Sequence, residues 1–183
     1  MKAIERLKEE HENIRLMLNI LNKISDKLQY RRELNQEHFS KIVEFLEVFV
    51  EKCHHGKEEN FLLPAMLEIG VPQDKGPIAS ILMEHKGLCR YLEDINSAFV
   101  RLKNGDYKTS EQIADNLKKY IALLSQHIDK ETNIFFSLVD KLLPESKQRD
   151  LAEDFEIFEM ECIDDEKRKE LCALLHHLNE IYI

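Results

Sequence analysis

Polar side chains with strong affinity for metals occupy helical stripes of this sequence that are otherwise apolar. Six such residues stand out: His11, His54, Glu58, His85, His127 and Glu131. Four of them form two His-x-x-x-Glu pairs, and a spacing of four puts both side chains of a pair on one face of a helix. Because an apolar stripe faces the core, the pattern directs all six donors toward one interior.

Burying these donors in a core requires partners for them. An imidazole or carboxylate buried without a partner costs on the order of a few kcal/mol, and more when it is charged. A whole domain is stabilised by only about 5–15 kcal/mol. A bound cation removes the cost, because it stabilises carboxylates and accepts imidazole lone pairs. The pattern therefore favours a metal site over six separately satisfied core residues.

The number of donors predicts how many ions they hold. Four histidines and two glutamates are too many for one ion with an open position, and they suit two ions. If both glutamates bridge and the histidines divide evenly, an octahedral ion keeps about two positions for a bridging oxygen and an exogenous ligand. Imidazole and carboxylate without thiolate favour iron, with manganese or zinc as weaker alternatives.

Long amphipathic segments must position these side chains. Apolar residues at alternating steps of three and four predict helices over about residues 3–28, 35–63, 78–103 and 110–143. We expect a turn near Tyr30–Leu34 and a loop at Gly70–Pro77, where glycine and proline cluster. Pro64 should stop or kink the second helix, and Pro144 should end the fourth.

Four long helices with short connections predict an all-α fold, an up-down-up-down antiparallel four-helix bundle over residues 1–143. In that topology all six donors reach a similar depth near one end, at about 1.5 Å per residue. Residues 144–183 are expected to form a C-terminal helical extension packed on the bundle. Its Phe155, Phe158 and Met160 should either cap the bundle or form the patch of a homodimer.

Composition excludes several classes of partner. A formal charge of −9 argues against nucleic acid or an anionic membrane. No apolar run approaches spanning length, and the N-terminus lacks the apolar core of a signal peptide. The four cysteines show no Cys-x-x-Cys spacing, which is typical of reduced thiols. We therefore expect a soluble cytoplasmic protein without a membrane or nucleic-acid partner.

The second helix leaves one alternative open. His55 and Glu59 have the same spacing as His54 and Glu58. We favour His54 and Glu58 because they continue the apolar stripe that runs through residues 43–50.

Acidic residues flank the candidate ligands along the chain. They are Glu9, Glu10, Glu12 and Glu84. We expect them to form solvated faces of the helices, and the alternative is that one of them orients an imidazole.

The stretches around the donors resemble the hemerythrin-like (HHE cation-binding) superfamily over about residues 1–143. They are Glu-Glu-His11, His54-His-Gly-Lys-Glu58-Glu-Asn-Phe-Leu-Leu-Pro64, Met-Glu-His85 and His127-Ile-Asp-Lys-Glu131-Thr-Asn-Ile-Phe-Phe. Their combination is specific, although each piece alone is weak. The resemblance implies a four-helix bundle that holds a carboxylate-bridged, non-haem di-iron centre of the Fe-O-Fe type, with the same six residues as ligands.

One position departs from the oxygen-carrying members, which look to have a second histidine four residues from the third-helix histidine. Cys89 stands there in this sequence, with Ile81 on the other side of His85. One metal should therefore carry fewer histidines, which argues against reversible oxygen storage and favours reactivity or sensing. We expect a packed Cys89 thiol rather than a thiolate ligand.

These features favour a di-iron protein that binds or reacts with oxygen, nitric oxide or a peroxide. A redox or oxygen sensor, or an interaction module whose acidic extension carries the output, is an alternative of another class. The ligand set and the stretch from Gly76-Pro77-Ile78 to His85 are also similar to the repair-of-iron-centres proteins, which implies iron delivery as a third reading. Classical hydrolysis is not expected, because no nucleophile–base grouping lies outside the ligand set.

Overall fold

The computed structural model describes residues 3–30 and 34–183, and within these ranges every regular element is helical. In chain order the elements are α1 (Ala3–Gln29), α2 (Gln36–Phe45), the π-helical η1 (Leu46–His55) and η2 (Glu58–Leu62), α3 (Leu63–Glu68), α4 (Gly76–Lys103), α5 (Thr109–Lys130), the π-helical η3 (Glu131–Phe135), α6 (Phe136–Leu142), α7 (Glu145–Cys162) and α8 (Asp165–Tyr182). The expected turn near Tyr30–Leu34 falls largely on residues 31–33, outside the described ranges.

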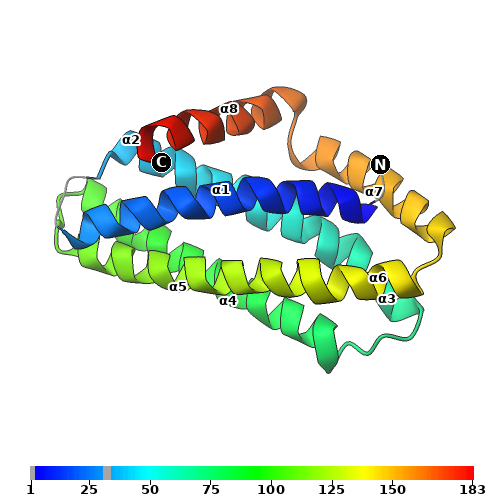
Figure 1. The fold of residues 1–183 in the computed structure, drawn as a ribbon. Helices are drawn as coiled ribbons and strands as arrows, with labels where there is room; N and C mark the ends of the chain where they lie inside the picture. The colour runs from blue at the N-terminus through cyan, green and yellow to red at the C-terminus, as the bar shows by residue number, and fades with distance from the viewer. Residues whose placement is uncertain (1–2, 31–33) are drawn as a thin grey trace.

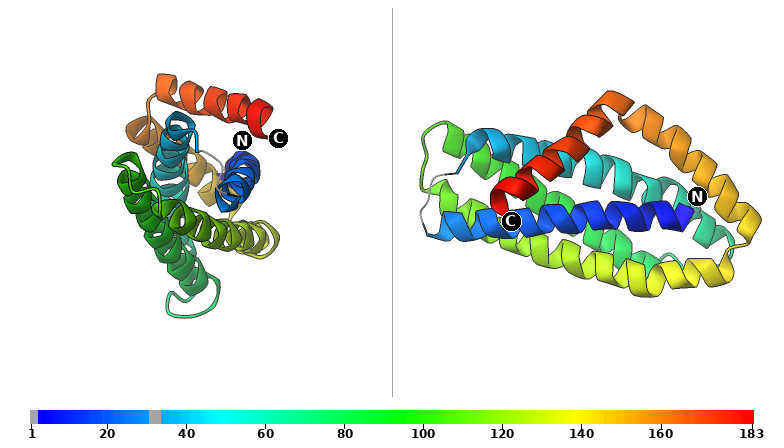
Figure 2. Two further views of the ribbon diagram at one scale, coloured as in Figure 1. Left: turned by 90° about the vertical axis from the view of Figure 1, so that its left-hand side faces the viewer. Right: turned by 45° about the horizontal axis from the view of Figure 1, so that its top comes forward.

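The helices pack as a bundle (Figure 1). α5 packs against both α1 and α4. The second helical segment runs from α2 through η1 and η2 to α3, and it contacts α1 and α4 through η1. α7 and α8 lie along one side of this bundle (Figure 2), where α7 contacts α1, η1 and η2 and α8 contacts α1 and α2. The C-terminal helices therefore cover the helical segment that carries His54 and Glu58.

The core consists of two apolar clusters with buried polar side chains between them. Leu7 and Ile81 belong to the smaller cluster, and Ile14 and Leu88 belong to the larger one. His11 and His85 stand between these positions and are buried. Along α1 and along α4 the chain passes from the smaller cluster to the larger one. Along the second segment, and along the fourth segment that runs from α5 through η3 to α6, it passes from the larger cluster to the smaller one. The polar layer thus crosses every segment of the bundle.

The second segment departs from the regular helix predicted for it. Its π-helical stretches η1 and η2 have i→i+5 hydrogen bonding, which shifts the side-chain register away from the 3.6-residue period. Pro64 does not stop the helix, and it lies where π-helical η2 passes into α3 and the hydrogen-bonding pattern changes. The helical path continues to Glu68.

The other boundaries agree closely with the sequence. The loop expected at residues 70–77 separates α3 from α4, and Gly70 (φ 91°) and Gly76 (φ 73°) supply left-handed backbone at its two ends. α6 ends at Leu142, before Pro144. Among the helices of the described chain, none combines the length and apolar character that crossing a bilayer requires.

Candidate metal centre

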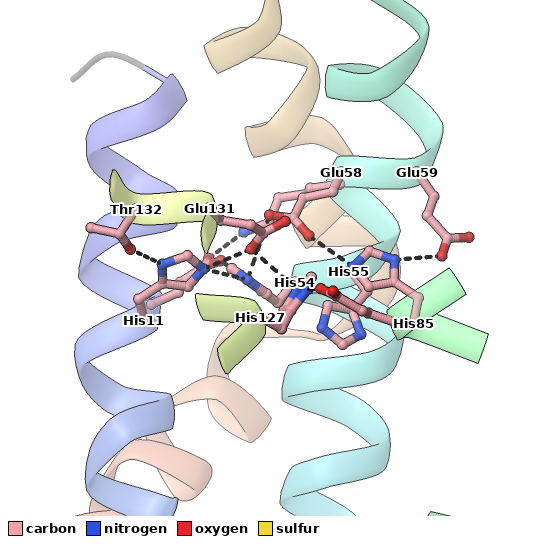
Figure 3. Close-up of polar contacts among 12 residues, drawn as sticks. His11, His54, His55, Glu58, Glu59, His85, His127, Glu131 and Thr132 are labelled. Carbon is pink, nitrogen blue, oxygen red and sulfur yellow. Dashed lines mark hydrogen bonds and ion pairs between the residues drawn. The ribbon is translucent and has the colours of Figure 1, made fainter. Parts of the chain in front are cut away.

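Buried metal-binding side chains from four helical segments converge between the two apolar clusters (Figure 3). Among the described residues they form two groups, His55, Glu58, His85 and His127 in the first and His11, His54, Glu58 and Glu131 in the second. The candidate ligand atoms of each group lie within 4.8 Å of one another, and Glu58 belongs to both groups. The two groups are therefore two adjoining candidate cation sites.

All six residues singled out in the sequence lie in this cluster, and the structure adds His55. His54 and Glu58, the preferred pair of the second helix, lie in the cluster. The alternative histidine, His55, lies there as well, so both consecutive imidazoles contribute to it. Both lie at the end of π-helical η1, whose register a 3.6-residue stripe does not describe. Glu59 lies outside the two groups. The sequence signals for His55 were its place next to His54 and its four-residue spacing from Glu59.

The four histidines predicted from the sequence divide evenly, with His85 and His127 in the first group and His11 and His54 in the second, and His55 joins the first. The first group has three histidines and the second has two. Cys89 belongs to neither group, and one group does carry fewer histidines than the other, although it is not the group of His85. His55, from a different helix, supplies an imidazole whose ring centroid lies 4.0 Å from that of His85.

Each of the five imidazoles turns Nε2 toward the interior and Nδ1 toward an outer partner. The Nδ1 partners are Thr132 Oγ1 for His11 (2.9 Å), Glu10 for His54 (2.8 Å), Glu51 for His55 (3.2 Å), Glu59 for His85 (2.7 Å) and Glu84 for His127 (3.0 Å). An ionised carboxylate only accepts hydrogen bonds, so it holds the proton on Nδ1 and leaves the Nε2 lone pair of a neutral imidazole facing inward. This is how carboxylates orient histidine ligands toward a metal.

The interior atoms of the cluster lack hydrogen-bond partners. They are Nε2 of His55, His85 and His127 and both carboxylate oxygens of Glu58 and Glu131. Nε2 of His11 and Nε2 of His54 face each other at 3.1 Å, and they form a hydrogen bond only when one of the two carries the proton. A buried polar atom without a partner costs about 1–3 kcal/mol. Because cations satisfy lone pairs and carboxylates together, the donor set fits bound metal.

Both glutamates lie between the two groups. Glu58 Oε1 is 3.7 Å from Nε2 of His54, and Glu58 Oε2 is 3.4 Å from Nε2 of His85. Glu131 Oε2 is 3.3 Å from Nε2 of His11 and 3.2 Å from Nε2 of His127. Each carboxylate therefore faces one histidine of each group, which is the placement that a bridging ligand requires.

Without a cation, protons on two imidazoles balance these carboxylates. Burial disfavours the charged form of His85, but its contacts with Glu58 and Glu59 prevail and raise its pKa to about 9. Burial acts in the same way on His127, and the charge of Glu131 nevertheless raises its pKa to about 10. For His55 burial prevails, and the neighbouring imidazoles add to it, so its pKa lies well below the usual value. Proton uptake is therefore concentrated on His85 and His127.

Two of the flanking acidic residues, the partly buried Glu10 and the buried Glu84, are partners of the cluster rather than parts of solvated faces. Glu10 bonds His54 Nδ1 and also accepts from Lys57. Burial alone raises the pKa of Glu10, but these two contacts outweigh burial and lower it to about 2. Glu84 bonds His127 Nδ1 and accepts from Lys130 and Ser80. The alternative in which acidic neighbours orient imidazoles is therefore the correct one for Glu10 and Glu84.

Cys89 is neither packed in the core nor a member of either ligand group. Its thiol is exposed and donates to Glu51 Oε2 at 3.0 Å, on the outer side of His55. Tyr120 also donates to Glu51, at 3.4 Å. Partial burial and the adjacent Glu51 raise the pKa of Cys89 to about 12, which keeps it a neutral thiol. The expectation of a packed thiol was wrong.

An apolar cleft opens beside the cluster, between α4 and the α5–α6 segment. Its volume is about 540 Å³, and Glu131 contributes to its lining. Apolar lining residues are Pro77, Ile81, Ile134, Phe135 and Leu138, and Glu84, Lys130 and Lys141 add further charged groups. The cleft therefore extends from solvent toward Glu131, whose carboxylate oxygens themselves stay buried.

Comparison with known proteins agrees with this geometry. The family model described as the hemerythrin HHE cation binding domain matches residues 2–139. No curated protein sequence and no solved structure matches the chain. The matched range contains all seven residues of the cluster and ends before α7.

Proposed function

The chain belongs to the hemerythrin HHE cation-binding domain family, and on that premise we propose that its cluster holds two iron ions and binds or reacts with a small ligand such as oxygen, nitric oxide or a peroxide. The observation that carries the proposal is the set of inward Nε2 atoms and carboxylate oxygens that have no hydrogen-bond partner. Imidazole and carboxylate without thiolate favour iron over manganese or zinc.

The proposed ligands follow the two groups. His55, His85 and His127 would hold one ion and His11 and His54 the other, with Glu58 and Glu131 bridging, since each glutamate faces both groups. Ferrous iron with an open position supplies ligand binding and electron transfer. The protein contributes orientation through the Nδ1 partners and excludes water through the apolar clusters on both sides.

The apolar cleft supports a small and weakly polar ligand. Its mostly apolar lining extends from solvent toward the buried Glu131, and such a cleft favours diatomic molecules over hydrated ions. Lys130 and Glu84 in its lining are paired with each other, so these two charges neutralise one another, and Lys141 also lines the cleft.

The proposal includes the topology expected from the sequence. The opposite order in which successive segments meet the two apolar clusters supports an up-down-up-down antiparallel four-helix bundle over residues 1–143. Residues 144–183 would then be an extension packed on that bundle.

Sensing is a second candidate, and the packing of α7 against η1 and η2 favours it because these elements carry ligands of both proposed ions. A sensor should transmit a change of redox state to the extension. We expect limited proteolysis after residue 144 to differ between reduced and oxidised protein if this candidate is correct, and identical digestion patterns would argue against it.

Replacing His55 tests the assignment most directly. Full-length protein from iron-fed cells should carry about two iron ions per chain, and His55→Ala should carry about one, because His55 belongs only to the first group. His176→Ala, an exposed histidine on α8, is the matched control and should retain both ions. Metal analysis after gel filtration measures the ratio. Wild-type protein with far less than two iron ions would refute the proposed function, whereas His55→Ala with two would refute only the role of His55.

A further inference from the structure

A fully buried lysine connects the candidate metal centre to the C-terminal extension. Lys57 has an exposed fraction of 0% and directly precedes Glu58 along the chain. Its ammonium group donates to Glu10 on α1 and to Glu159 on α7. A buried ammonium group is strongly destabilising without charged partners. The position of Lys57 therefore depends on carboxylates from two other helices.

The extension fits closely onto the turn that carries the ligands. Gly56 lies between His55 and Lys57, and a Cβ atom there would be 2.9 Å from the ring of Phe158 on α7. The Phe155 ring lies 5.8 Å from the Lys57 ammonium group and is fully buried. The absence of a side chain at Gly56 thus lets α7 approach the backbone beside the ligands.

Glu159 is the charged centre of this contact. It is 2% exposed and accepts from Lys57, from Arg6 of α1 and from Arg168 of α8. Lys57 in turn holds Glu10, whose other carboxylate oxygen is 2.8 Å from Nδ1 of His54. A continuous set of charged contacts therefore runs from α7 to one candidate ligand.

We propose that Glu159 is a positioning residue for the metal centre, and this inference rests on the proposed function. Glu159 anchors Lys57, Lys57 fixes Glu10, and Glu10 holds the His54 imidazole with its Nε2 facing inward. The docked extension thereby sets how tightly the ion of the second group is retained. Glu159 lies beyond residue 139, where the family match ends, so this control belongs to the extension of this chain.

The loss of Glu159 has a definite physical consequence. Lys57 would keep Glu10 as its partner, and the ammonium group would gain a second one only by moving toward solvent. That movement of the ammonium group would draw Glu10 away from the His54 imidazole. Loss of such an outer partner typically lowers metal affinity by about 10–100-fold.

The effect should be confined to one ion. His55, His85 and His127 take their Nδ1 partners from Glu51, Glu59 and Glu84. Lys57 and Glu159 contact none of these three carboxylates in the described chain. The first group should therefore keep its ion at the wild-type rate.

Release of iron to a chelator tests the proposal on the full-length, iron-loaded protein. In Glu159→Gln one of the two ions should be released about 10–100-fold faster, and the other should be released at the wild-type rate. Glu156→Gln is the matched control, because it makes the same change at an exposed position on the same helix. Both of its ions should follow wild type.

A double-mutant cycle tests whether Glu159 acts through Lys57. In a Lys57→Met background, the further change Glu159→Gln should leave the release rates unaltered. If Glu159 had a purely structural role, Glu159→Gln would accelerate iron release equally in the wild-type and Lys57→Met backgrounds.

Nitrogen-15 NMR of the metal-free protein gives an independent readout. Glu159→Gln should shift the His54 imidazole toward mixed tautomers, and Glu156→Gln should not.

Three outcomes would overturn the inference. One is Glu159→Gln that releases both ions at wild-type rates, and another is equal acceleration of both ions, which indicates general loosening. The third concerns Glu159→Asp, a variant that keeps the negative charge and serves if the glutamine variant fails to fold. Failure of Glu159→Asp to restore iron retention would contradict the inference. Wild-type protein that binds no second ion would instead refute the proposed function, so the two failures are distinguishable.

Discussion

Replacement of Glu58 by glutamine is expected to release both ions, a larger loss than replacement of any one histidine in the cluster should produce. Glu58 belongs to both ligand groups, and its two oxygens face His54 and His85 separately. An amide carries no negative charge and offers one weak acceptor in place of two. We expect the affinity for both ions to fall by more than the roughly 100-fold typical of an outer-shell change.

Thermal unfolding measures this loss without an activity assay. At a free metal concentration about 1,000 times Kd, one bound ion stabilises the folded state by about 4 kcal/mol. For a chain of this size that corresponds to roughly 10 °C, at about 2–4 °C per kcal/mol. Iron should raise the Tm of the wild-type protein by at least this amount, and it should leave the Tm of Glu58→Gln almost unchanged.

Glu59→Gln is the matched control for this experiment. It is the same substitution one residue further along, at a carboxylate that bonds the outer Nδ1 of His85 and is 45% exposed. It should weaken binding by about 10–100-fold and keep a clear metal-dependent rise in Tm. Equal behaviour of the two variants would contradict the bridging role of Glu58.

Metal affinity is expected to fall steeply as the pH falls from 8 to 6. The pKa values of His85 and His127, about 9 and about 10, mean that both imidazoles carry protons throughout this range in the metal-free protein. Binding must displace both protons, so each pH unit costs about tenfold per proton. The combined affinity for two ions should therefore drop by about 10⁴ between pH 8 and pH 6.

The stability of the metal-free protein should show the opposite trend. A raised pKa means that the protonated form stabilises the fold fully below the usual histidine value of 6.5, and that this stabilisation disappears as the pH rises through about 9 and 10.

Calorimetric titration of the protein with metal, in buffers of different ionisation enthalpy, counts the protons released on binding. Fewer than about one proton released at pH 7, or pH-independent affinity, would contradict the assigned charges.

Local patterns in the sequence were sufficient for the helices and for the six donors. Apolar residues at steps of three and four placed the ends of α1 and α4 within about two residues of those observed. The His-x-x-x-Glu pairs placed their members on one helix face, and both pairs lie in the cluster. Such inferences succeed because they depend only on the spacing of residues along one helix.

Tertiary structure decided what that spacing does not contain. His55 enters the cluster because η1 is π-helical, and its turn departs from the period used to choose between the two histidines. The uneven division into three and two histidines follows from this change of register. Cys89 stays outside the two ligand groups, where its thiol donates a hydrogen bond to Glu51, 38 residues earlier in the chain.

The outer partners were also decided by packing. Glu10 orients His54 from a different helix, and Glu159 reaches Lys57 from a helix 102 residues later in the chain. The sequence by itself determined which residue types are available for binding metal and on which helical faces they lie. Only the folded chain determined which carboxylate meets which imidazole, because contacts between helices depend on how their surfaces fit together and on which buried charges must be neutralised.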